Sequence, residues 1–243
     1  MARTAAALVI GNEILTGKTQ EQNVAFLAKE LFDLGVELRR VVVCPDDIDC
    51  IVTELHALCP AHDVVFTSGG VGPTHDDVTL DAVARAVDRP LVRSEELAAL
   101  IRGYFGDRCT EEHLRMANVP EGSELLRSEQ VPWPTVVAGN VFIFPGVPEI
   151  FRAKFPVVRG RLRADAPFVS RAVFTLCEEG EIAELLARLA RQFPSVSIGS
   201  YLKWRGSDYS VKVTFDGRDR DAIERASSAF TTAIPKDKVL RAE

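Results

Sequence analysis

Along the first ninety residues, segments with the apolar pattern of strands alternate with segments in which apolar residues recur at helical spacing. Runs rich in apolar residues predict strands at residues 5–10, 36–43 and 63–67, and the first, which is continuous, is typical of a strand buried on both faces. After each run and its polar loop, apolar residues recur at helical spacing, at residues 24–34, 48–58 and 80–87. Three successive strand–helix units predict a parallel sheet wrapped by helices.

The middle of the chain predicts helices followed by a hairpin. Ser94 is placed to cap a helix over residues 95–104, and another short helix is expected at residues 111–117. The apolar segments 135–138 and 141–144 flank Gly139-Asn140, a two-residue hairpin signal. An antiparallel pair is therefore expected beside the parallel sheet.

A second domain is predicted after residues 159–167, a charged segment with no apolar period. Beyond it the pattern predicts a strand, a helix, two strands and a helix, at residues 171–177, 182–193, 196–201, 209–215 and 223–230. The fold class is therefore α/β, with a larger domain over residues 1–163 and a small β-α-β-β-α sandwich over residues 168–243.

Composition and charge narrow the possible partners. Of the 243 residues, 47% are hydrophobic and 26% charged, which suits a packed globular protein. The net charge of −6 argues against general attraction to nucleic acid or to an anionic membrane. No apolar run approaches the ~20 residues that span a bilayer, so a cytoplasmic location is expected. Five cysteines without CxxC spacing are expected to be reduced and mostly buried.

The candidate site follows from where an open parallel sheet binds ligands, outside the carboxyl ends of its strands. The loops expected there, residues 11–13, 45–47, 68–77 and 145–149, are rich in glycine, proline and carboxylates. Within one of them, Gly69, Gly70 and Gly72 follow a strand and precede a helix, where backbone N–H groups can reach phosphate oxygens. The loop has neither a Walker A sequence nor a GxGxxG fingerprint.

Two carboxylates, Asp76 and Asp77, follow these glycines directly. They would repel a phosphate ligand unless one caps the next helix or a divalent cation lies between them. If the three units share one sheet, Glu13, Asp46 and Asp77 meet at one rim and could hold a metal ion and orient a water. Capping alone is the simpler alternative for Asp76 or Asp77, and His75 is more often a surface residue than a catalyst.

Aromatic and cationic residues are interleaved at residues 201–209 of the predicted second domain. Trp204, between Lys203 and Arg205, could stack on a flat ring. Packing at a domain or subunit contact explains these aromatics equally well.

Four motifs together resemble the molybdopterin-binding-like domain of the CinA (competence/damage-inducible protein A) family, in the version found at the N-terminus of eukaryotic FAD synthases. They are Gly11-Asn-Glu-Ile-Leu-Thr-Gly17, Asn23, Ser68-Gly-Gly-Val-Gly-Pro-Thr-His-Asp-Asp77 and Phe144-Pro-Gly-Val-Pro148. The resemblance covers nearly the whole chain. It implies a three-layer, doubly wound, mostly parallel α/β domain, a small second α/β domain, and a homo-oligomer.

The resemblance also implies a reaction, the metal-dependent hydrolysis of the pyrophosphate bond of FAD or ADP-ribose with Mg²⁺, Mn²⁺ or Co²⁺. Asp46 and Asp77 match acidic residues that line a pterin or nucleotide site. The expected catalytic residues are Glu13, Asp46, Asp76 and Asp77, with Glu13, Asp46 and Asp77 as metal ligands. The expected phosphate- or nucleotide-binding residues are Gly11, Asn12, Ser68, Gly69, Gly70, Gly72, Pro73, Thr74, Gly146 and Pro148.

Two alternative functions stay open. One is a pterin-handling protein of molybdenum-cofactor assembly, which would share the fold and the acidic rim. The other is a nucleotide-binding module without chemistry. FAD synthesis is not expected, because the adenylyltransferase domain of FAD synthase is absent from this sequence.

Overall fold

The computed structural model describes residues 4–162, 166–203 and 208–243. The chain divides into two compact units, Met1–Asp165 and Ala166–Glu243. The boundary predicted from sequence, residues 159–167, includes residues 163–165, which lie outside the described residues.

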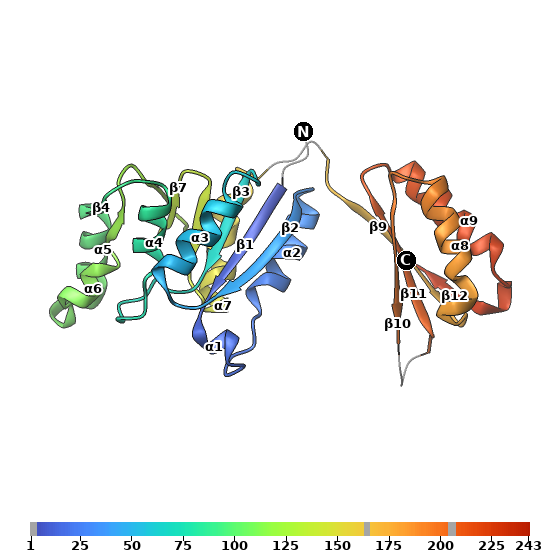
Figure 1. The fold of residues 1–243 in the computed structure, drawn as a ribbon, viewed down its shortest axis with the longest axis horizontal. Coiled ribbons are helices and arrows are strands. Elements are labelled where there is room, and N and C mark those ends of the chain that lie inside the picture. Colours follow the sequence, from blue (N-terminus) through green and yellow to red (C-terminus); the bar gives the residue numbers. More distant parts are fainter. Residues whose placement is uncertain (1–3, 163–165, 204–207) are drawn as a thin grey trace. The chain divides into compact units, whose positions relative to one another are not determined.

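The first unit is built on a six-stranded sheet with the order β2-β1-β3-β8-β7-β6 (Figure 1). Four strands are parallel, and they are β1 (Thr4–Ile10), β2 (Glu37–Cys44), β3 (Val64–Ser68) and β8 (Val141–Phe144). Two more pair antiparallel at the β8 edge, β7 (Thr135–Ala138) and β6 (Glu124–Leu126). The chain runs from β1 to β2 on one side and to β3 on the other, so the strand order reverses beside β1, where the ligand crevice of such folds lies.

Helices form a layer on each face of this sheet, which confirms the predicted three-layer, doubly wound architecture. One layer contains α2 (Asn23–Asp33) and α7 (Pro148–Arg159), whose Leu27, Leu31, Phe151 and Phe155 share a buried cluster. The other contains α3 (Ile48–Leu58), α4 (Thr79–Ala86) and α5 (Glu95–Phe105). Beyond α5 lie the turn η1 (Gly106–Arg108), α6 (Glu111–Arg115) and the small pair β4 (Leu91–Arg93) and β5 (Asn118–Pro120).

Local signals explain where several of these elements begin and turn. The Ser94 side chain accepts a hydrogen bond from the Leu97 amide and caps α5, as predicted. The expected hairpin forms between β7 and β8, with Gly139 at φ +60°. The Asn140 side chain in that turn donates to the carbonyls of Cys59 and His62 and ties the hairpin to the end of α3.

The sequence reading missed several elements of the first unit. The most important is α7, because Pro148 and Pro156 interrupt a stretch in which Phe151, Phe155 and Val158 keep helical spacing. Pro148 occupies the first turn, where its missing N–H costs nothing, and so it starts the helix rather than preventing it. The short helix α1 (Asn12–Leu15) and the three-residue strands β4, β5 and β6 were also missed, since so few residues show no period.

The second unit is a four-stranded antiparallel sheet with the order β10-β11-β9-β12. The strands are β9 (Val169–Thr175), β10 (Ser197–Leu202), β11 (Val211–Gly217) and β12 (Val239–Ala242), and the turn η2 (Lys236–Lys238) precedes the last. Its core packs α8 (Glu179–Gln192) and α9 (Arg220–Ala233) on the sheet through Ile182, Phe215 and Phe230. The predicted β-α-β-β-α order is present, with β12 added. Trp204 and Arg205 lie outside the described residues.

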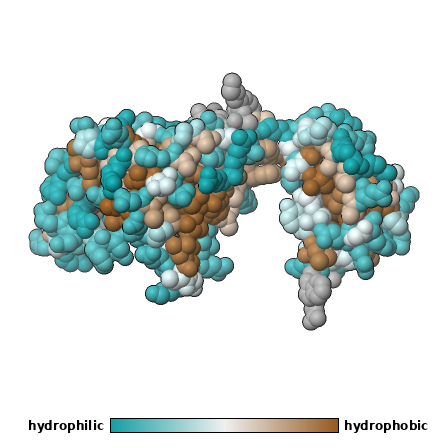
Figure 2. All heavy atoms as spheres, in the orientation of Figure 1, coloured by the Kyte–Doolittle hydropathy of each residue, from teal (hydrophilic) through white to brown (hydrophobic). Residues whose placement is uncertain are grey.

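The surface shows polar residues with scattered apolar ones (Figure 2). Val41 and Val43 of the edge strand β2 are among the exposed apolar side chains. Cys44 and Cys177 are buried, whereas Cys50 is exposed and Cys59 and Cys109 are half-buried, so fewer thiols are buried than predicted.

Among the described residues, no helix is both long and apolar enough to cross a bilayer.

Candidate functional site

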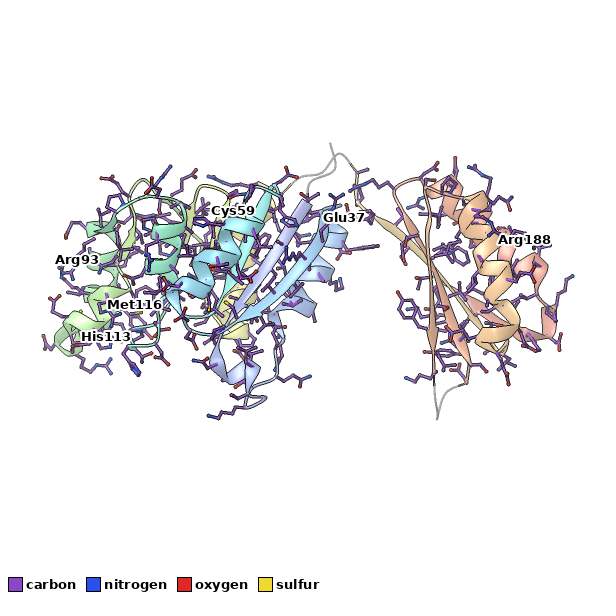
Figure 3. The ribbon with its side chains drawn as sticks, viewed as in Figure 1. Glu37, Cys59, Arg93, His113, Met116 and Arg188 are labelled. Atoms are coloured by element: carbon purple, nitrogen blue, oxygen red, sulfur yellow. The ribbon has the colours of Figure 1, made fainter. Side chains whose placement is uncertain are left out.

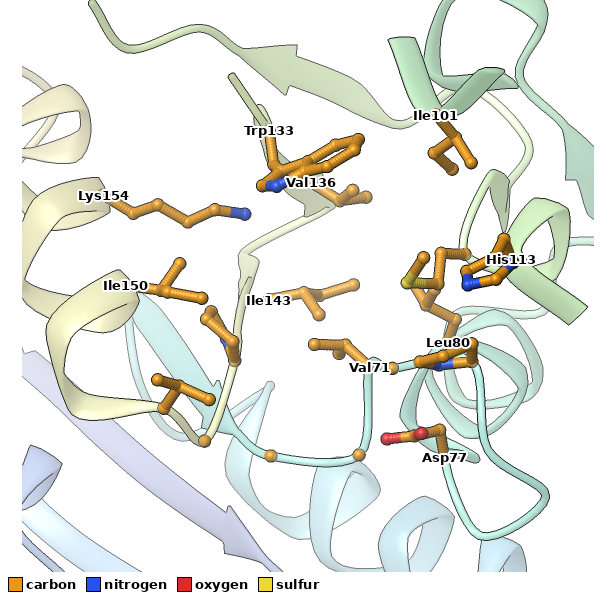
Figure 4. A pocket seen from close by; sticks show the side chains of 18 of the residues that line it. Val71, Asp77, Leu80, Ile101, His113, Trp133, Val136, Ile143, Ile150 and Lys154 are labelled. Atoms are coloured by element: carbon orange, nitrogen blue, oxygen red, sulfur yellow. The ribbon is translucent and has the colours of Figure 1, made fainter. Parts of the chain in front are cut away.

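A cavity of about 900 Å³ opens in the first unit where β3 and β8 end (Figure 4). Its polar side is formed by the loop after β3 and the loop after β8, through Gly69, Gly70, Gly72, Pro73, Gly146 and Pro148. These residues are called the cradle below. All six were predicted as phosphate or nucleotide contacts, whereas Gly11, Asn12, Ser68 and Thr74 lie outside the cavity wall. The Thr19 and Val147 residues also line the wall.

The cradle has a backbone shape that only glycine can take. Gly69 has φ +112°, and a Cβ there would stand 2.1 Å from the Ile10 carbonyl oxygen. Gly70 has φ +64°, and its Cβ would stand 2.4 Å from the Thr79 Oγ1. Because no L side chain fits either position without moving backbone or a buried hydroxyl, glycine is required by geometry at both.

The cradle presents backbone donors that the protein itself does not use. Within the described ranges, the N–H groups of Gly70, Val71 and Gly72 donate to no protein acceptor, and all three residues line the cavity. Consecutive amides of this kind form a concave site for an anion. The local geometry therefore fits a phosphate group, as the sequence predicts.

Buried hydrogen bonds hold the cradle in place from below. The Thr79 hydroxyl, at the start of α4, donates to the Gly69 carbonyl over 2.8 Å. The Asn23 side chain, only 4% exposed at the start of α2, donates to both the Ser68 hydroxyl and the Gly146 carbonyl, each over 2.9 Å. Asn23 thus joins the loops after β3 and β8, which explains its place among the four motifs.

Asp77 faces the cavity beside the glycines. Its Oδ2 accepts hydrogen bonds from the Thr74 amide over 2.8 Å and from the Thr74 hydroxyl over 2.6 Å. Gly72 leaves room for this carboxylate, since a Cβ there would stand 2.7 Å from Asp77 Oδ2. The alternative that Asp76 or Asp77 merely caps the next helix is wrong, because the N-cap of α4 is Val78 and makes no side-chain hydrogen bond.

Glu13 is the second carboxylate on the cavity wall. It lies in α1 after the end of β1, and its carboxylate folds back over Gly11, where a Cβ would stand 2.5 Å from Glu13 Oε1. The structure therefore brings Glu13 and Asp77, which are distant in sequence, to the same cavity.

The other two predicted carboxylates lie outside the cavity wall. Asp46 accepts a hydrogen bond from the Asn12 amide over 2.8 Å and so holds the start of α1, next to Glu13. Asp76 faces the Thr74 hydroxyl at 2.5 Å, and this hydrogen bond lowers the pKa of the Asp76 carboxyl below its ordinary value. The neighbouring His75 side chain is 96% exposed.

The donors at the cavity can be compared with what a divalent metal needs. Among the described residues, no three His, Cys, Asp or Glu side chains gather closely enough to hold an ion by themselves. Mg²⁺, however, is commonly bound through one or two carboxylates together with phosphate oxygens and waters. Glu13 and Asp77, both on the cavity wall, suit that second arrangement. The predicted three-carboxylate set does not form among the described residues, because Asp46 is outside the cavity wall and accepts from the Asn12 amide.

The remaining cavity wall is apolar, and sequence reasoning did not find it. It is formed by Ile101, Tyr104, Phe105, His113, Met116 and Trp133, called the apolar end below. Figure 3 shows His113 and Met116 at the edge of the first unit opposite Glu37 of β2. The Tyr104 and Trp133 rings meet edge to face at 5.1 Å. These residues come from segments that are adjacent only in space, and no motif marks them.

Lys154 of α7 was also missed. Its side chain lines the cavity, yet the residue is only 8% exposed, and its Nζ donates to the Pro134 carbonyl over 2.9 Å. Burial lowers the pKa of Lys154 to about 8. Figure 4 shows Lys154 and Trp133 on one side of the cavity and Asp77 on the opposite side. The cavity thus carries cationic and anionic groups at separate places.

Two family models match the chain, one for each unit. A model described as a probable molybdopterin binding domain matches residues 6–164. A model described as the FAD synthase middle domain matches residues 167–243.

Individual relatives agree with both matches. A protein of Archaeoglobus fulgidus is 33% identical over 221 residues, which cover 91% of this chain and 93% of the relative. The probable FAD synthase of Caenorhabditis elegans is 32% identical over 249 residues, or 91% of this chain. The chain spans only 48% of the length of that relative.

A solved structure shares the architecture of the first unit. The crystal structure of the protein CinA with unknown function from Thermoplasma acidophilum is 31% identical in sequence and superposes with a TM-score of 0.62. The match covers 67% of this chain and 100% of the solved one.

Proposed function

This chain belongs to the family of probable molybdopterin-binding domains, and we propose on that premise that its cavity binds a dinucleotide such as FAD or ADP-ribose and hydrolyses the pyrophosphate bond. The expected relation to CinA and to FAD synthases is confirmed by the matched models and relatives. The hydrolysis itself, its metal and its substrate are the proposal.

The observation that carries the proposal is the meeting of unused amides and carboxylates at one cavity. Residues 70–72, whose three N–H groups donate to no acceptor among the described residues, line the same cavity as Glu13 and Asp77. Amides attract a phosphate, whereas two carboxylates repel it. A diphosphate is tolerated beside both only with a cation, so the arrangement suits a diphosphate that binds together with a divalent metal.

The reaction joins a water oxygen to one phosphorus and breaks the bond from that phosphorus to the bridging oxygen, which gives two monophosphates. The cradle amides hold the diphosphate and offset charge on its oxygens in the transition state. Glu13 and Asp77 would hold the metal, and one of them orients the attacking water. When bound, the divalent cation supplies Lewis acidity at the phosphate oxygens.

The test is hydrolysis of FAD and of ADP-ribose by the purified chain with Mg²⁺, Mn²⁺ or Co²⁺, followed by chromatography of the monophosphates. We expect turnover with at least one metal and none with EDTA. Asp77→Asn keeps a hydrogen-bond acceptor for Thr74 but removes the charge, so kcat should fall by about 100-fold.

The matched control is Asp49→Asn, an equal loss of charge at a carboxylate of α3 that is 83% exposed and lies outside the cavity wall. It should change kcat by less than about threefold, because solvent screens an exposed carboxylate. No turnover with any metal would refute the hydrolase, and equal losses in both variants would refute the role of Asp77.

A second function is favoured by the apolar end of the cavity, which suits a flat pterin ring as well as a flavin. In this alternative the chain binds molybdopterin and ATP, joins the adenylyl group of ATP to the molybdopterin phosphate and releases pyrophosphate, without hydrolysing a dinucleotide. Adenylylated molybdopterin among the products would identify it.

We also propose a cytoplasmic location and assembly of identical copies, the latter testable by light scattering of the purified chain.

A further inference from the structure

Lys154 is a buried cation, and no carboxylate in the described part of the chain pairs with its charge. Among the described residues, no carboxylate lies within ion-pair distance of its Nζ, and its recorded hydrogen bond is the one to the Pro134 carbonyl. An ammonium carries three N–H donors, so two remain. A buried cation usually has a paired anion or further acceptors, because removing it from water is costly.

The surroundings of Lys154 indicate which kind of acceptor would take the two remaining N–H donors of its ammonium. Its neighbours on the cavity wall in Figure 4 are Trp133, Val136, Ile143 and Ile150, none of which carries charge. A phosphate there would bring two charges into an apolar setting with a single cation. The loop after β3 has the unused amides and is the better place for phosphate, and Figure 4 shows its Asp77 across the cavity from Lys154.

The apolar end beside Lys154 suits a flat ring. Its aromatic members include Trp133 and Tyr104, with ring centroids 5.1 Å apart, and Phe105 and His113, with centroids 4.0 Å apart. Ligand sites of this kind combine apolar walls with one or two polar groups that fix the orientation. Figure 4 shows Lys154 next to Trp133 and across the cavity from Ile101 and His113, so a ring bound between these side chains would have Lys154 at its edge.

We infer that Lys154 is a specificity-determining residue, whose ammonium donates to a carbonyl oxygen on the edge of an oxo-substituted heterocycle. Flavins and pterins share this chemistry, whereas adenine carries an amino group and no carbonyl. The inference rests on the proposed function for the identity of the cavity as a nucleotide or pterin site. It adds which ring the site prefers and which residue makes the choice.

The experiment measures binding of FMN, neopterin and AMP to the full chain in the presence of Mg²⁺. None of these ligands has a pyrophosphate bond, so the result does not depend on hydrolysis. Lys154→Met has a similar length without the donors, and it should weaken the binding of the oxo-heterocycle by about tenfold or more. AMP binding should change by less than about twofold. Arg152→Met is the matched control, because it removes an exposed cation from the same helix.

The outcomes distinguish a flavin from a pterin as the ring that the site binds. Selective weakening of FMN identifies a flavin ring, and selective weakening of neopterin identifies a pterin ring. Equal weakening of all three ligands, no weakening, or a wild-type chain that binds neither FMN nor neopterin would overturn the inference. If Lys154→Met does not fold, Lys154→Leu removes the same donors and gives the same comparison, and thermal melting monitors folding. Selective Lys154-dependent binding without any FAD hydrolysis would refute the proposed reaction and leave this inference standing.

Discussion

The two ends of the cavity are built by different means. The cradle is a backbone structure, in which positive φ angles and buried hydrogen bonds leave few residue choices. The apolar end is a side-chain structure, whose aromatic residues come from α5, α6 and the segment before β7. A backbone site tolerates little change and suits the invariant part of a ligand, such as its phosphates. The side chains of such a site can be replaced with little loss of folding free energy, so the site suits the part of a ligand that distinguishes it from other ligands.

The largest effect should come from Gly69→Ala in the cradle. The new Cβ would stand 2.1 Å from the Ile10 carbonyl oxygen in a backbone conformation that L residues rarely adopt. We expect the free energy of unfolding to fall by more than about 3 kcal/mol, because both the left-handed strain and the clash must be relieved. Urea denaturation measures it.

Gly139→Ala is the control for that experiment. Gly139 also has a positive φ, +60°, but nothing lies within 4 Å of an added Cβ. Its cost should therefore be the strain alone, roughly 1 kcal/mol. Equal losses at the two positions would show that the close approach to Ile10 contributes nothing, and would remove the physical basis for a rigid cradle.

The difference between a backbone site and a side-chain site also explains which parts of the cavity could be predicted from the sequence. The cradle was found because glycines between a strand and a helix have few other uses, and because the strand-end rule selects those loops in advance. Glu13 and Asp77 were placed together correctly on the same rule. Asp46 follows a strand at the same rim, but its side chain accepts from the Asn12 amide outside the cavity wall, a tertiary contact that no sequence pattern encodes.

The apolar end and Lys154 could not be predicted, for two reasons. Tyr104, His113 and Trp133 look like ordinary surface or core residues until tertiary packing brings them together. Lys154 lies on α7, a helix that was not predicted because it contains prolines at positions 148 and 156. A lysine outside any predicted element gives no sign of burial, since lysine is nearly always exposed.

A medium effect on stability is expected from Lys154→Met, and it should depend on pH. Burial lowers the Lys154 pKa to about 8 in the folded chain, against 10.5 for the free side chain. The unfolded state therefore binds more protons between those values, so wild-type stability relative to the variant rises as pH increases. The penalty is fully present below about pH 8 and is relieved toward pH 10.5.

Lys154→Met should therefore stabilise the chain at pH 7 by about 1–2 kcal/mol, after allowance for the lost hydrogen bond to Pro134. The gain should shrink steadily between about pH 8 and 10.5 in urea denaturation. Arg152→Met should show no such pH dependence. A gain that grows with pH would mean that the Lys154 charge is compensated in the fold, contrary to its surroundings.

The smallest effect on stability should come from Tyr104→Ala at the apolar end. The Tyr104 residue is 61% exposed, so its loss should cost less than about 1 kcal/mol of folding free energy. FMN affinity should nevertheless fall about fivefold, since stacking of an aromatic side chain on a ring contributes on the order of 1 kcal/mol or more. Tyr201→Ala, a tyrosine 58% exposed on β10 of the second unit, is the matched control and should leave FMN affinity unchanged. If Tyr104→Ala lowers stability as much as a cradle substitution, or leaves FMN affinity intact, then the apolar end is part of the scaffold and does not distinguish ligands.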